Sequence, residues 1–369
     1  MNRKIKVLIV DDSAMVRQIL KDGLSRDEGI EVVGAAPDVF AARDMIVRLK
    51  PDVLTLDVEM PKMDGVEFLR RLMPQYPIPV VMVSSLTVKG KKITMDALEA
   101  GAIDFVSKPT SDVARGLSGM LSELRTKIKI ASTANVSHWK NKRVQKAVRT
   151  VESSSSLAES TDKVIVIGAS TGGTEAIREV IERFPRNTPG VVIVQHMPGG
   201  FTKVFSDRMN SLCQMEVKEA ENDDRVLQGR VLIAPGGERQ MTIVRSGGVY
   251  RVKLEEGEKV CGHRPSVEVL MQSAALSVGS NAIGVMLTGM GHDGADGMVA
   301  MRRAGARTLA QDEASCIVYG MPKEAYERGG AETLVPLNNI ASHVISILSG
   351  RVPVKTMTAK VNNEQRVIS

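Results

Sequence analysis

Residues 164–181 read VIVIGASTGGTEAIREVI, and this stretch decides the fold of the second half of the chain. An apolar run, a glycine-rich turn and a helical segment follow one another in it, which is the pattern of one βα unit of a parallel sheet. Within the turn, residues 168–172 (GASTG) fit the pattern G-x-S-x-G of a serine nucleophile. Such a sharp turn lifts Ser170 to the edge of the sheet, and a backbone N–H at the start of the following helix, such as that of Thr171, can stabilise an oxyanion.

Glycine-rich turns of this kind also bind phosphates, so a nucleotide site is the competing interpretation. A P-loop needs Gly-Lys-Ser/Thr, and no lysine stands in this turn. A dinucleotide fingerprint needs G-x-G-x-x-G and an acidic residue about 20 positions further on. GASTGGTEA lacks that glycine spacing, and the next predicted strand ends in Gln195 and His196 instead of an acid. The nucleophile is therefore favoured.

A nucleophilic serine needs a base, and the base needs a carboxylate that fixes its tautomer. His196 directly follows the predicted strand 190–195, and Asp293 follows the predicted strand 281–287, both at the carboxyl edge of the sheet. His292 competes with His196 as the base, but it adjoins Asp293, and adjacent side chains usually point apart. The chain order is serine, histidine, aspartate, whereas α/β-hydrolases run serine, acid, histidine, so we expect similar chemistry on a different fold.

Strand-like and helix-like segments alternate on both sides of a polar stretch. The predicted strands are 5–10, 31–36, 52–57, 79–84 and 104–106 before it, and 163–168, 190–195, 230–235, 281–287 and 306–311 after it. In the second half, helices are predicted near 173–184, 201–212, 265–277, 294–304 and 338–349, and a β-hairpin on the parallel sheet at 241–245 and 249–254. The fold class is α/β, with two doubly wound parallel-sheet domains. The first is a (βα)5 domain, and the second is larger, Rossmann-like and α/β/α, with the hairpin.

Four regions are expected along the chain. They are a first domain over 1–126, a basic and polar linker over 127–162, a second domain over 163–350 and a flexible tail over 351–369. The net charge of +6 is concentrated in the linker, where residues 127–150 hold seven Lys and Arg and no Asp or Glu. The two domains are therefore near neutral, which argues against a nucleic-acid partner. The single tryptophan, Trp139, lies in the linker without an assigned role.

The chain has no apolar run near the roughly 18 residues that span a bilayer. The short apolar run at the N-terminus ends in two Asp residues without a cleavage site, which excludes a signal peptide. Three cysteines, odd in number and without zinc-ligand spacing, are typical of free thiols in a reducing compartment. We therefore expect a cytoplasmic protein without membrane insertion.

Three carboxylates are expected at one edge of the first sheet. Asp11 and Asp12 follow the first predicted strand, and Asp57 ends the third. Ligands of open parallel sheets bind outside the carboxyl ends of the strands. Clustered carboxylates need a hard cation, and Mg²⁺ takes oxygen ligands. Ser84 closes the fourth strand and Lys108 follows the fifth, so a hydroxyl and an ammonium group would face an anion at this edge. Helix capping explains any single Asp here, but not the whole set.

This set resembles the receiver domain of two-component response regulators, through VDDS (10–13), LDVEMPKMDG (56–65), MVSS (82–85) and FVSKP (105–109). The resemblance implies that Asp57 accepts a phosphoryl group, with a histidine kinase as the donor. It implies that Asp12 and Asp57 bind Mg²⁺. Asp11 would support them, and the backbone carbonyl of Glu59 would be a further ligand. Phe105 takes the position of the switch aromatic residue.

The second domain resembles the methylesterase domain of the chemotaxis protein-glutamate methylesterase family. The resemblance rests on IGASTGGTEAI (167–177), QHMP (195–198), GFT (200–202), LIAPGG (232–237), RPSVEVL (264–270), LTGMGHDGA (287–295) and AQDEASCIVYGMP (310–322). It implies that Ser170 is the nucleophile and His196 the general base and acid. Asp293 would orient the histidine, and the backbone of Met290 would lie at the oxyanion site.

By the same resemblance, the reaction is hydrolysis of glutamate methyl esters, and deamidation of glutamines, on the cytoplasmic domains of chemoreceptors. The esterase reaction needs no cofactor. The family also suggests that the receiver inhibits the hydrolase by contact until it is phosphorylated, with Ser84 and Phe105 as the two-state element. Gly199 and His292 depart from the residues common in the family, which leaves loop rigidity and the local pKa open.

Two other classes of protein compete with this interpretation. A response regulator that binds DNA would have a small, basic output domain with a recognition helix, whereas this output is long, near neutral and α/β. A non-enzymatic adaptor built on a decayed hydrolase would have lost part of the serine, histidine and aspartate set, which is complete here. The hydrolase is therefore favoured over both.

Overall fold

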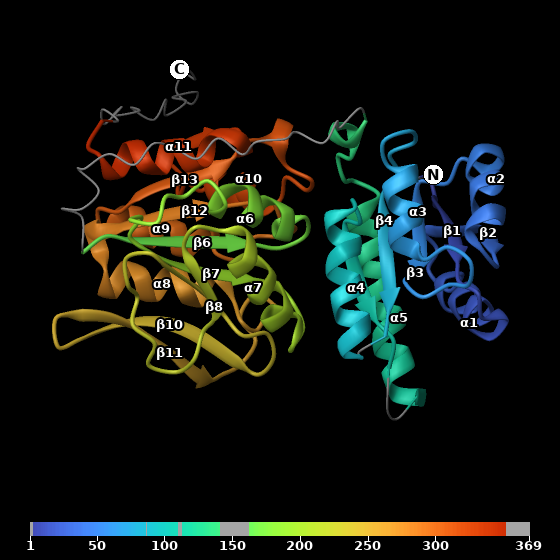
Figure 1. Cartoon of the computed structure of the whole chain (residues 1–369), viewed down its shortest axis with the longest axis horizontal. Helices are drawn as coiled ribbons and strands as arrows, with labels where there is room; N and C mark the ends of the chain where they lie inside the picture. The colour runs from blue at the N-terminus through green and yellow to red at the C-terminus, as the bar shows by residue number, and fades with distance from the viewer. Residues whose placement is uncertain (1–2, 86, 110–112, 141–161, 352–369) are drawn as a thin grey trace, which may run out of the picture.

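Two α/β domains lie side by side in the computed structural model, which describes residues 3–85, 87–109, 113–140 and 162–351 (Figure 1). The first domain holds a five-stranded sheet and the second a seven-stranded sheet. All pairings within these two sheets are parallel, which confirms the predicted fold class. Most of the expected linker and the expected tail beyond residue 351 lie outside the described residues.

The first sheet has the order β2-β1-β3-β4-β5. Its strands are β1 (Ile5–Val10), β2 (Ile30–Ala36), β3 (Val53–Asp57), β4 (Val80–Ser84) and β5 (Asp104–Ser107). The helices are α1 (Ala14–Leu24), α2 (Val39–Leu49), α3 (Gly65–Leu72), α4 (Val88–Glu99) and α5 (Val113–Ala131). Four of these helices start at polar side chains that accept backbone N–H groups, namely Ser13, Asp38, Asp64 and Thr87. β3 and β4 are buried along their whole length, as apolar strands covered on both faces should be.

Helix α5 continues beyond the expected end of the first domain. Residues 127–131 form its last turns, and a short 3₁₀ helix, η1 (Ser137–Trp139), follows. The Trp139 ring packs at Gly101 of the first domain, where an added Cβ would lie 3.1 Å from the ring. The start of the basic segment is therefore part of the folded first domain.

The second sheet has the order β14-β13-β12-β6-β7-β9-β8. Its strands are β6 (Val164–Ala169), β7 (Gly190–Gln195), β8 (Glu216–Glu219), β9 (Arg230–Ile233), β12 (Ala282–Met286), β13 (Arg307–Gln311) and β14 (Thr333–Val335). The helices are α6 (Gly173–Ile181), α7 (Phe201–Leu212), α8 (Val267–Ser277), α9 (Ala295–Arg303), α10 (Met321–Glu327) and α11 (Leu337–Leu348). The short elements β8, β14 and α10 were not predicted from the sequence.

The predicted hairpin exists, but its predicted place on the parallel sheet was wrong. β10 (Arg239–Ser246) and β11 (Val249–Glu256) pair with each other as a two-stranded antiparallel sheet of their own. The turn residues Gly247 and Gly248 have φ of +59° and +82°, the left-handed geometry that tight hairpins need. The hairpin packs on α8, where Ser273 Oγ accepts from the N–H of Ile243 at 2.9 Å.

The strand order of the second sheet reverses at β6. From β6 the chain builds outward through β7 on one side, and later through β12 on the other. Ligands of open α/β sheets bind at such a switch point, outside the carboxyl ends of the strands. The segments that follow β6, β7 and β12 carry Ser170, His196 and Asp293.

Candidate functional site

Three side chains meet in a line at the switch point of the second sheet. Ser170 Oγ lies 3.1 Å from His196 Nδ1, and His196 Nε2 lies 2.7 Å from Asp293 Oδ2. The turn that carries Ser170 is held open by Gly172, whose φ of +77° favours glycine. His292, the competing base of the sequence analysis, is exposed and stands outside this line. The structure thus brings together the three residues predicted to act jointly.

The carboxylate of Asp293 is fixed by the start of helix α8. Ser266 Oγ donates to Oδ1 at 2.7 Å, and the N–H groups of Val267 and Glu268 donate at 2.8 and 3.0 Å. Burial alone would raise the pKa of Asp293, but the bonds from His196, Ser266 and the helix backbone hold it below its usual value. An ionised Asp293 accepts the Nε2–H of His196. The lone pair of the ring is then on Nδ1, which faces Ser170.

The loop that follows β12 lies against the serine turn. The N–H of Ser170 donates to the carbonyl of Thr288 at 3.0 Å, and Thr288 Oγ1 donates to the carbonyl of Thr171 at 3.1 Å. Gly289 packs so closely that an added Cβ would lie 2.8 Å from the Cβ of Ser170. In the part of the chain that the structure describes, the N–H groups of Thr171 and Met290 donate to no other group. Both are therefore free to face an oxyanion.

Sequence reasoning missed three polar residues of this site. Gln195 Nε2 donates to the carbonyls of Ser170 and His196, at 2.9 and 3.1 Å, and so ties the serine turn to the strand of the base. Ser266 binds Asp293, and the ring of His263 is stacked on that of His196. Gln195 and Ser266 lie inside the motifs QHMP and RPSVEVL, but only the sheet order shows which loops these residues face.

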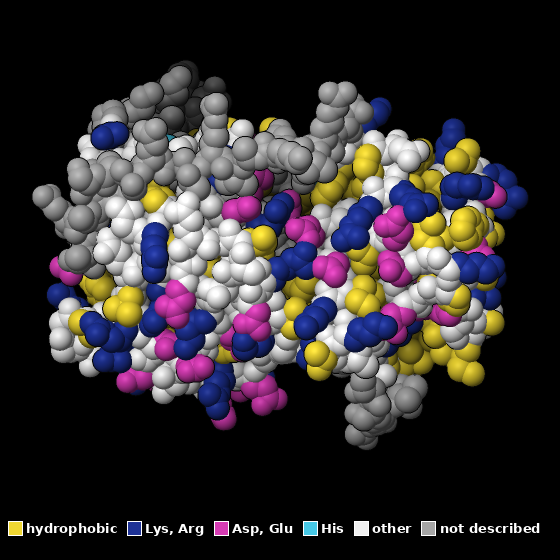
Figure 2. Space-filling view, viewed as in Figure 1, with side chains coloured by type: hydrophobic (Ala, Val, Ile, Leu, Met, Phe, Trp, Pro, Cys, Tyr) yellow, Lys and Arg dark blue, Asp and Glu magenta, His cyan; other side chains and the backbone are white. Residues whose placement is uncertain are grey.

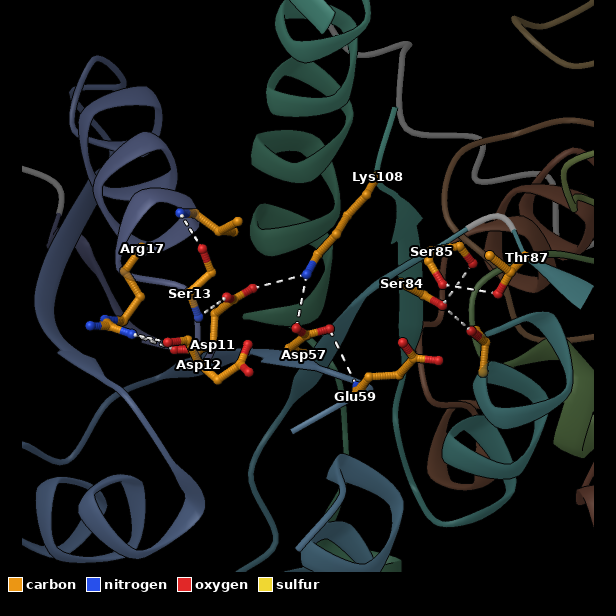
Figure 3. Close-up of polar contacts among 12 residues, drawn as sticks. Asp11, Asp12, Ser13, Arg17, Asp57, Glu59, Ser84, Ser85, Thr87 and Lys108 are labelled. Atoms are coloured by element: carbon orange, nitrogen blue, oxygen red, sulfur yellow. Dashed lines mark hydrogen bonds and ion pairs between the residues drawn. The ribbon is translucent and has the colours of Figure 1, made fainter. Parts of the chain in front are cut away.

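The acid pocket of the first domain lies at the carboxyl edge of its sheet (Figure 3). The carboxylates of Asp11, Asp12 and Asp57 each place an oxygen within 4.8 Å of the others. Lys108 Nζ points between two of them and donates to Asp11 at 3.1 Å and to Asp57 at 2.9 Å. This set of oxygens fits a hard cation such as Mg²⁺. Glu59 lines the same pocket, and its N–H lies 3.5 Å from Asp57 Oδ1.

Burial has the largest effect on the charges of this pocket. It raises the pKa of Asp57, and the neighbouring Lys108 only partly opposes that rise. For Lys108, burial works toward a lower pKa, but the two carboxylates outweigh it and raise the pKa. Lys108 therefore stays protonated as the cationic partner of Asp57.

The side chains of Ser84 and Phe105, the two expected switch residues, make contacts outside the acid pocket. The Ser84 hydroxyl was expected to face an anion at Asp57. Ser84 Oγ is buried and turned away from Asp57, 2.5 Å from Thr94 Oγ1 of helix α4 (Figure 3). The ring of Phe105 is buried as well, and its centroid lies 4.4 Å from that of Phe201 in the second domain. The expected switch residues thus face α4 and the other domain.

The first domain contacts the residue next to the nucleophile. Thr171 Oγ1 donates to Asp104 Oδ2 at 3.0 Å, and Asp104 also receives Lys127 Nζ at 2.9 Å. On α7, Arg208 binds the carboxylates of both Asp96 and Glu99 on α4. Figure 2 shows charged side chains of both signs along the boundary between the domains. Apolar and ionic contacts therefore hold the receiver-like domain beside the serine site.

Comparison with known proteins matches two family models to separate parts of the chain. A family model described as CheB methylesterase matches residues 165–344, and one described as response regulator receiver domain matches residues 7–115. A protein-glutamate methylesterase/protein-glutamine glutaminase of Syntrophotalea carbinolica is 67% identical over 353 residues, which cover 95% of this chain and 99% of that protein. The chain belongs to this family.

A relative of the same name from Escherichia coli O157:H7 is 51% identical over 94% of this chain and 97% of its own length. The solved structure of the Thermotoga maritima CheB methylesterase catalytic domain is 38% identical, with a TM-score of 0.49 over 50% of this chain and 98% of that one. The two family models and the two relatives confirm the family resemblance drawn from the sequence motifs. Among the described residues, no helix combines the length and apolar character needed to cross a bilayer.

Proposed function

We propose that Ser170, His196 and Asp293 carry out the reaction for which the family is named. That reaction is hydrolysis of glutamate methyl esters and of glutamine amides in proteins, by a domain under the control of a phosphorylated receiver. The observation that carries the proposal is the line of hydrogen bonds, 3.1 Å from Ser170 Oγ to His196 Nδ1 and 2.7 Å from His196 Nε2 to Asp293 Oδ2.

The first half of the reaction forms an acyl-enzyme. Ser170 Oγ attacks the ester carbonyl while Nδ1 of His196 takes its proton, and Asp293 stabilises the resulting imidazolium. The negative charge on the carbonyl oxygen is received by the N–H groups of Thr171 and Met290. The tetrahedral intermediate collapses, His196 returns the proton to the leaving oxygen, and methanol departs.

The second half regenerates the serine. His196 removes a proton from water, the hydroxide attacks the acyl carbonyl, and Ser170 leaves with the proton that His196 returns. The product is the glutamate carboxylate. A glutamine amide follows the same steps with ammonia as the leaving group, and neither reaction needs a cofactor at this site.

The first domain supplies the regulation in this proposal. Asp57 is the phosphoryl acceptor. Asp12 and Asp57, with Asp11 and the backbone carbonyl of Glu59, would hold Mg²⁺, which would neutralise charge on the transferred group. Lys108 then pairs with the phosphoryl oxygens. We assign this receiver to residues 1–126 together with the end of α5, the hydrolase to 163–350, and the linker and tail to the segments 127–162 and 351–369.

Partners follow from the same chemistry. We infer that a histidine kinase of the cytoplasm donates the phosphoryl group and that the cytoplasmic domains of chemoreceptors carry the methylated glutamates. The hydrogen bond from Thr171 to Asp104 supports inhibition by contact, because the receiver then covers the residue beside the nucleophile. Movement of Ser84 toward a phosphoryl group would free space for Phe105 and weaken its contact with Phe201.

Methanol release from methylated receptor membranes tests the proposal. The full chain should release methanol, and a small phosphodonor with Mg²⁺ should raise the rate. Ser170→Ala should abolish release while leaving phosphorylation of Asp57 intact. Methanol release by Ser170→Ala within tenfold of the wild-type rate would show that another group is the nucleophile.

A further inference from the structure

A second histidine lies flat against the proposed base. The ring centroids of His263 and His196 are 3.6 Å apart, and the ring planes are 10° from parallel. Both nitrogens of His196 are already engaged, by Ser170 and by Asp293, so His263 covers a face of the ring and not an edge. The inference rests on the proposed function, because it gives His263 a role beside the base that this function assigns to His196.

The backbone around His263 is fixed by a tight turn. Val260 and His263 exchange two hydrogen bonds, at 3.1 and 2.9 Å. The two residues between them, Cys261 and Gly262, have φ of +52° and +84°, the signs that a type I′ turn requires. Gln240 Nε2 also lies 3.5 Å from the His263 carbonyl. The backbone that carries the imidazole is thus fixed by a short, closed turn.

The same segment of chain holds the carboxylate of the site. Three residues after His263, Ser266 and the first N–H groups of α8 bind Asp293. One continuous stretch, 260–268, therefore fixes both the acid that binds the edge of the base and the ring that covers its face.

The charge state of His263 suits this place. The pKa of His263 is lowered to about 4, mainly by burial, and the charges of Lys259 and Lys127 act in the same direction while Asp293 opposes them. The ring is therefore uncharged at neutral pH. An uncharged aromatic face stabilises a cation beside it, so it favours the imidazolium that His196 becomes, whereas a second imidazolium would repel it.

We propose that His263 is a positioning residue, whose flat ring holds the plane of the His196 imidazole so that Nδ1 points at Ser170 Oγ throughout the reaction. The last torsion of a histidine is broad, and two hydrogen bonds alone let the ring tilt about the line that joins its nitrogens. In the acyl-enzyme the bond to Ser170 is lost. Asp293 and the stack on His263 then hold the base in place for activation of water.

The test compares two substitutions in the full chain, in the presence of phosphodonor and Mg²⁺. His263→Ala removes the ring, and misalignment of a base typically costs up to about a hundredfold in rate. We expect a fall in kcat of about ten- to a hundredfold with KM changed by less than about threefold, because the ring faces the base and not the receptor. His263→Phe keeps a flat ring without nitrogens and should recover kcat to within about fivefold of wild type.

A labelling rate, a control variant and a check of folding accompany this test. The rate at which a fluorophosphonate labels Ser170 should fall in His263→Ala by the same factor as kcat, independently of receptor binding. His343→Ala is the matched control, since His343 is also half-buried but lies on α11, and its kcat should stay within about twofold of wild type. Thermal unfolding of each variant shows that its fold is intact.

Failure of the His263 proposal and failure of the proposed function give different results. If His263→Phe, with an intact fold, is as slow as His263→Ala, a ring nitrogen is required, and the positioning role is wrong. Wild-type kcat in His263→Ala also overturns it. Ser170→Ala is assayed alongside, and methanol release by that variant refutes the proposed function itself, whatever the His263 variants do.

Discussion

Arg208 provides the sharpest test of regulation by contact between the domains. It lies on α7 of the hydrolase domain and binds Asp96 and Glu99 on α4 of the receiver. Its side chain is 29% exposed, and those of the two acids are 38% and 35% exposed. Partly exposed pairs such as these contribute up to about 1 kcal/mol each, so Arg208→Ala should weaken docking by about 1–2 kcal/mol.

That loss translates into a measurable change in basal activity. In docked molecules the receiver contacts the hydrolase, and in open molecules it does not. A change of about 1–2 kcal/mol shifts the ratio of open to docked molecules by roughly five- to thirtyfold. If only open molecules accept a receptor, methanol release without phosphodonor should rise by up to that factor. Release with phosphodonor should change little, because the open form already dominates there. Raising the salt concentration should reduce the difference between variant and wild type, since screening weakens the same pairs.

Two controls belong to this experiment. Arg230→Ala removes an arginine that pairs with Glu216 at 2.8 Å on the far strands of the hydrolase sheet, and its basal activity should equal that of wild type. The double variant Asp96→Asn with Glu99→Gln removes the Arg208 pairs from the receiver side, together with the pair of Glu99 and Arg178 at 3.9 Å, and should raise basal activity at least as much as Arg208→Ala. Basal activity of a folded Arg208→Ala protein within twofold of wild type would refute the idea that these pairs keep the domains docked.

Three further predictions concern the catalytic and phosphorylation residues. Ser170→Ala and His196→Ala should each lower methanol release by several orders of magnitude, and the double variant should be little worse. His292→Ala should lower methanol release by less than about tenfold. The reverse ranking of the two histidines would reassign the base. Phosphodonor with Mg²⁺ should label the wild type with a base-labile acyl phosphate, and labelling of Asp57→Asn at the same level would move the phosphorylation site. The fragment 150–369 should release methanol faster than the unphosphorylated full chain and should ignore phosphodonor, so a slower fragment would rule out simple inhibition.

The sequence predicted those elements that consist of an apolar run and end at polar or glycine-rich residues. The central strands and the residues that follow them, such as Ser170, His196 and Asp293, were found because buried parallel strands are apolar and their carboxyl ends share one edge. Short elements such as β8 and β14 were missed because three or four residues give too little periodicity. The hairpin was found from its turn, but the turn says nothing of which sheet it joins.

Contacts between distant segments were beyond the reach of the sequence. The stack of His263 on His196 depends on a loop that no strand or helix pattern marks. The direction of the Ser84 hydroxyl depends on its rotamer, and the sequence does not show that its partner is Thr94. The contact of Phe105 with Phe201 depends on how two domains dock, and each ring alone looks like an ordinary core residue.

Strand β5 lies at the edge of its sheet, so one side of its backbone is open to pairing with another molecule. Its backbone pairs with β4 on one side only, and two of its residues, Asp104 and Phe105, contact the hydrolase domain. An exposed edge strand is a template for strands of other molecules. While the domains are docked, the hydrolase contacts the side chains of Asp104 and Phe105 on this strand. Separation of the domains would remove these contacts. β5 is only four residues long and lies beside Lys108 and Lys127, which are features that limit strand addition. Aggregation of the activated protein at high concentration should therefore begin at this edge and stay weak.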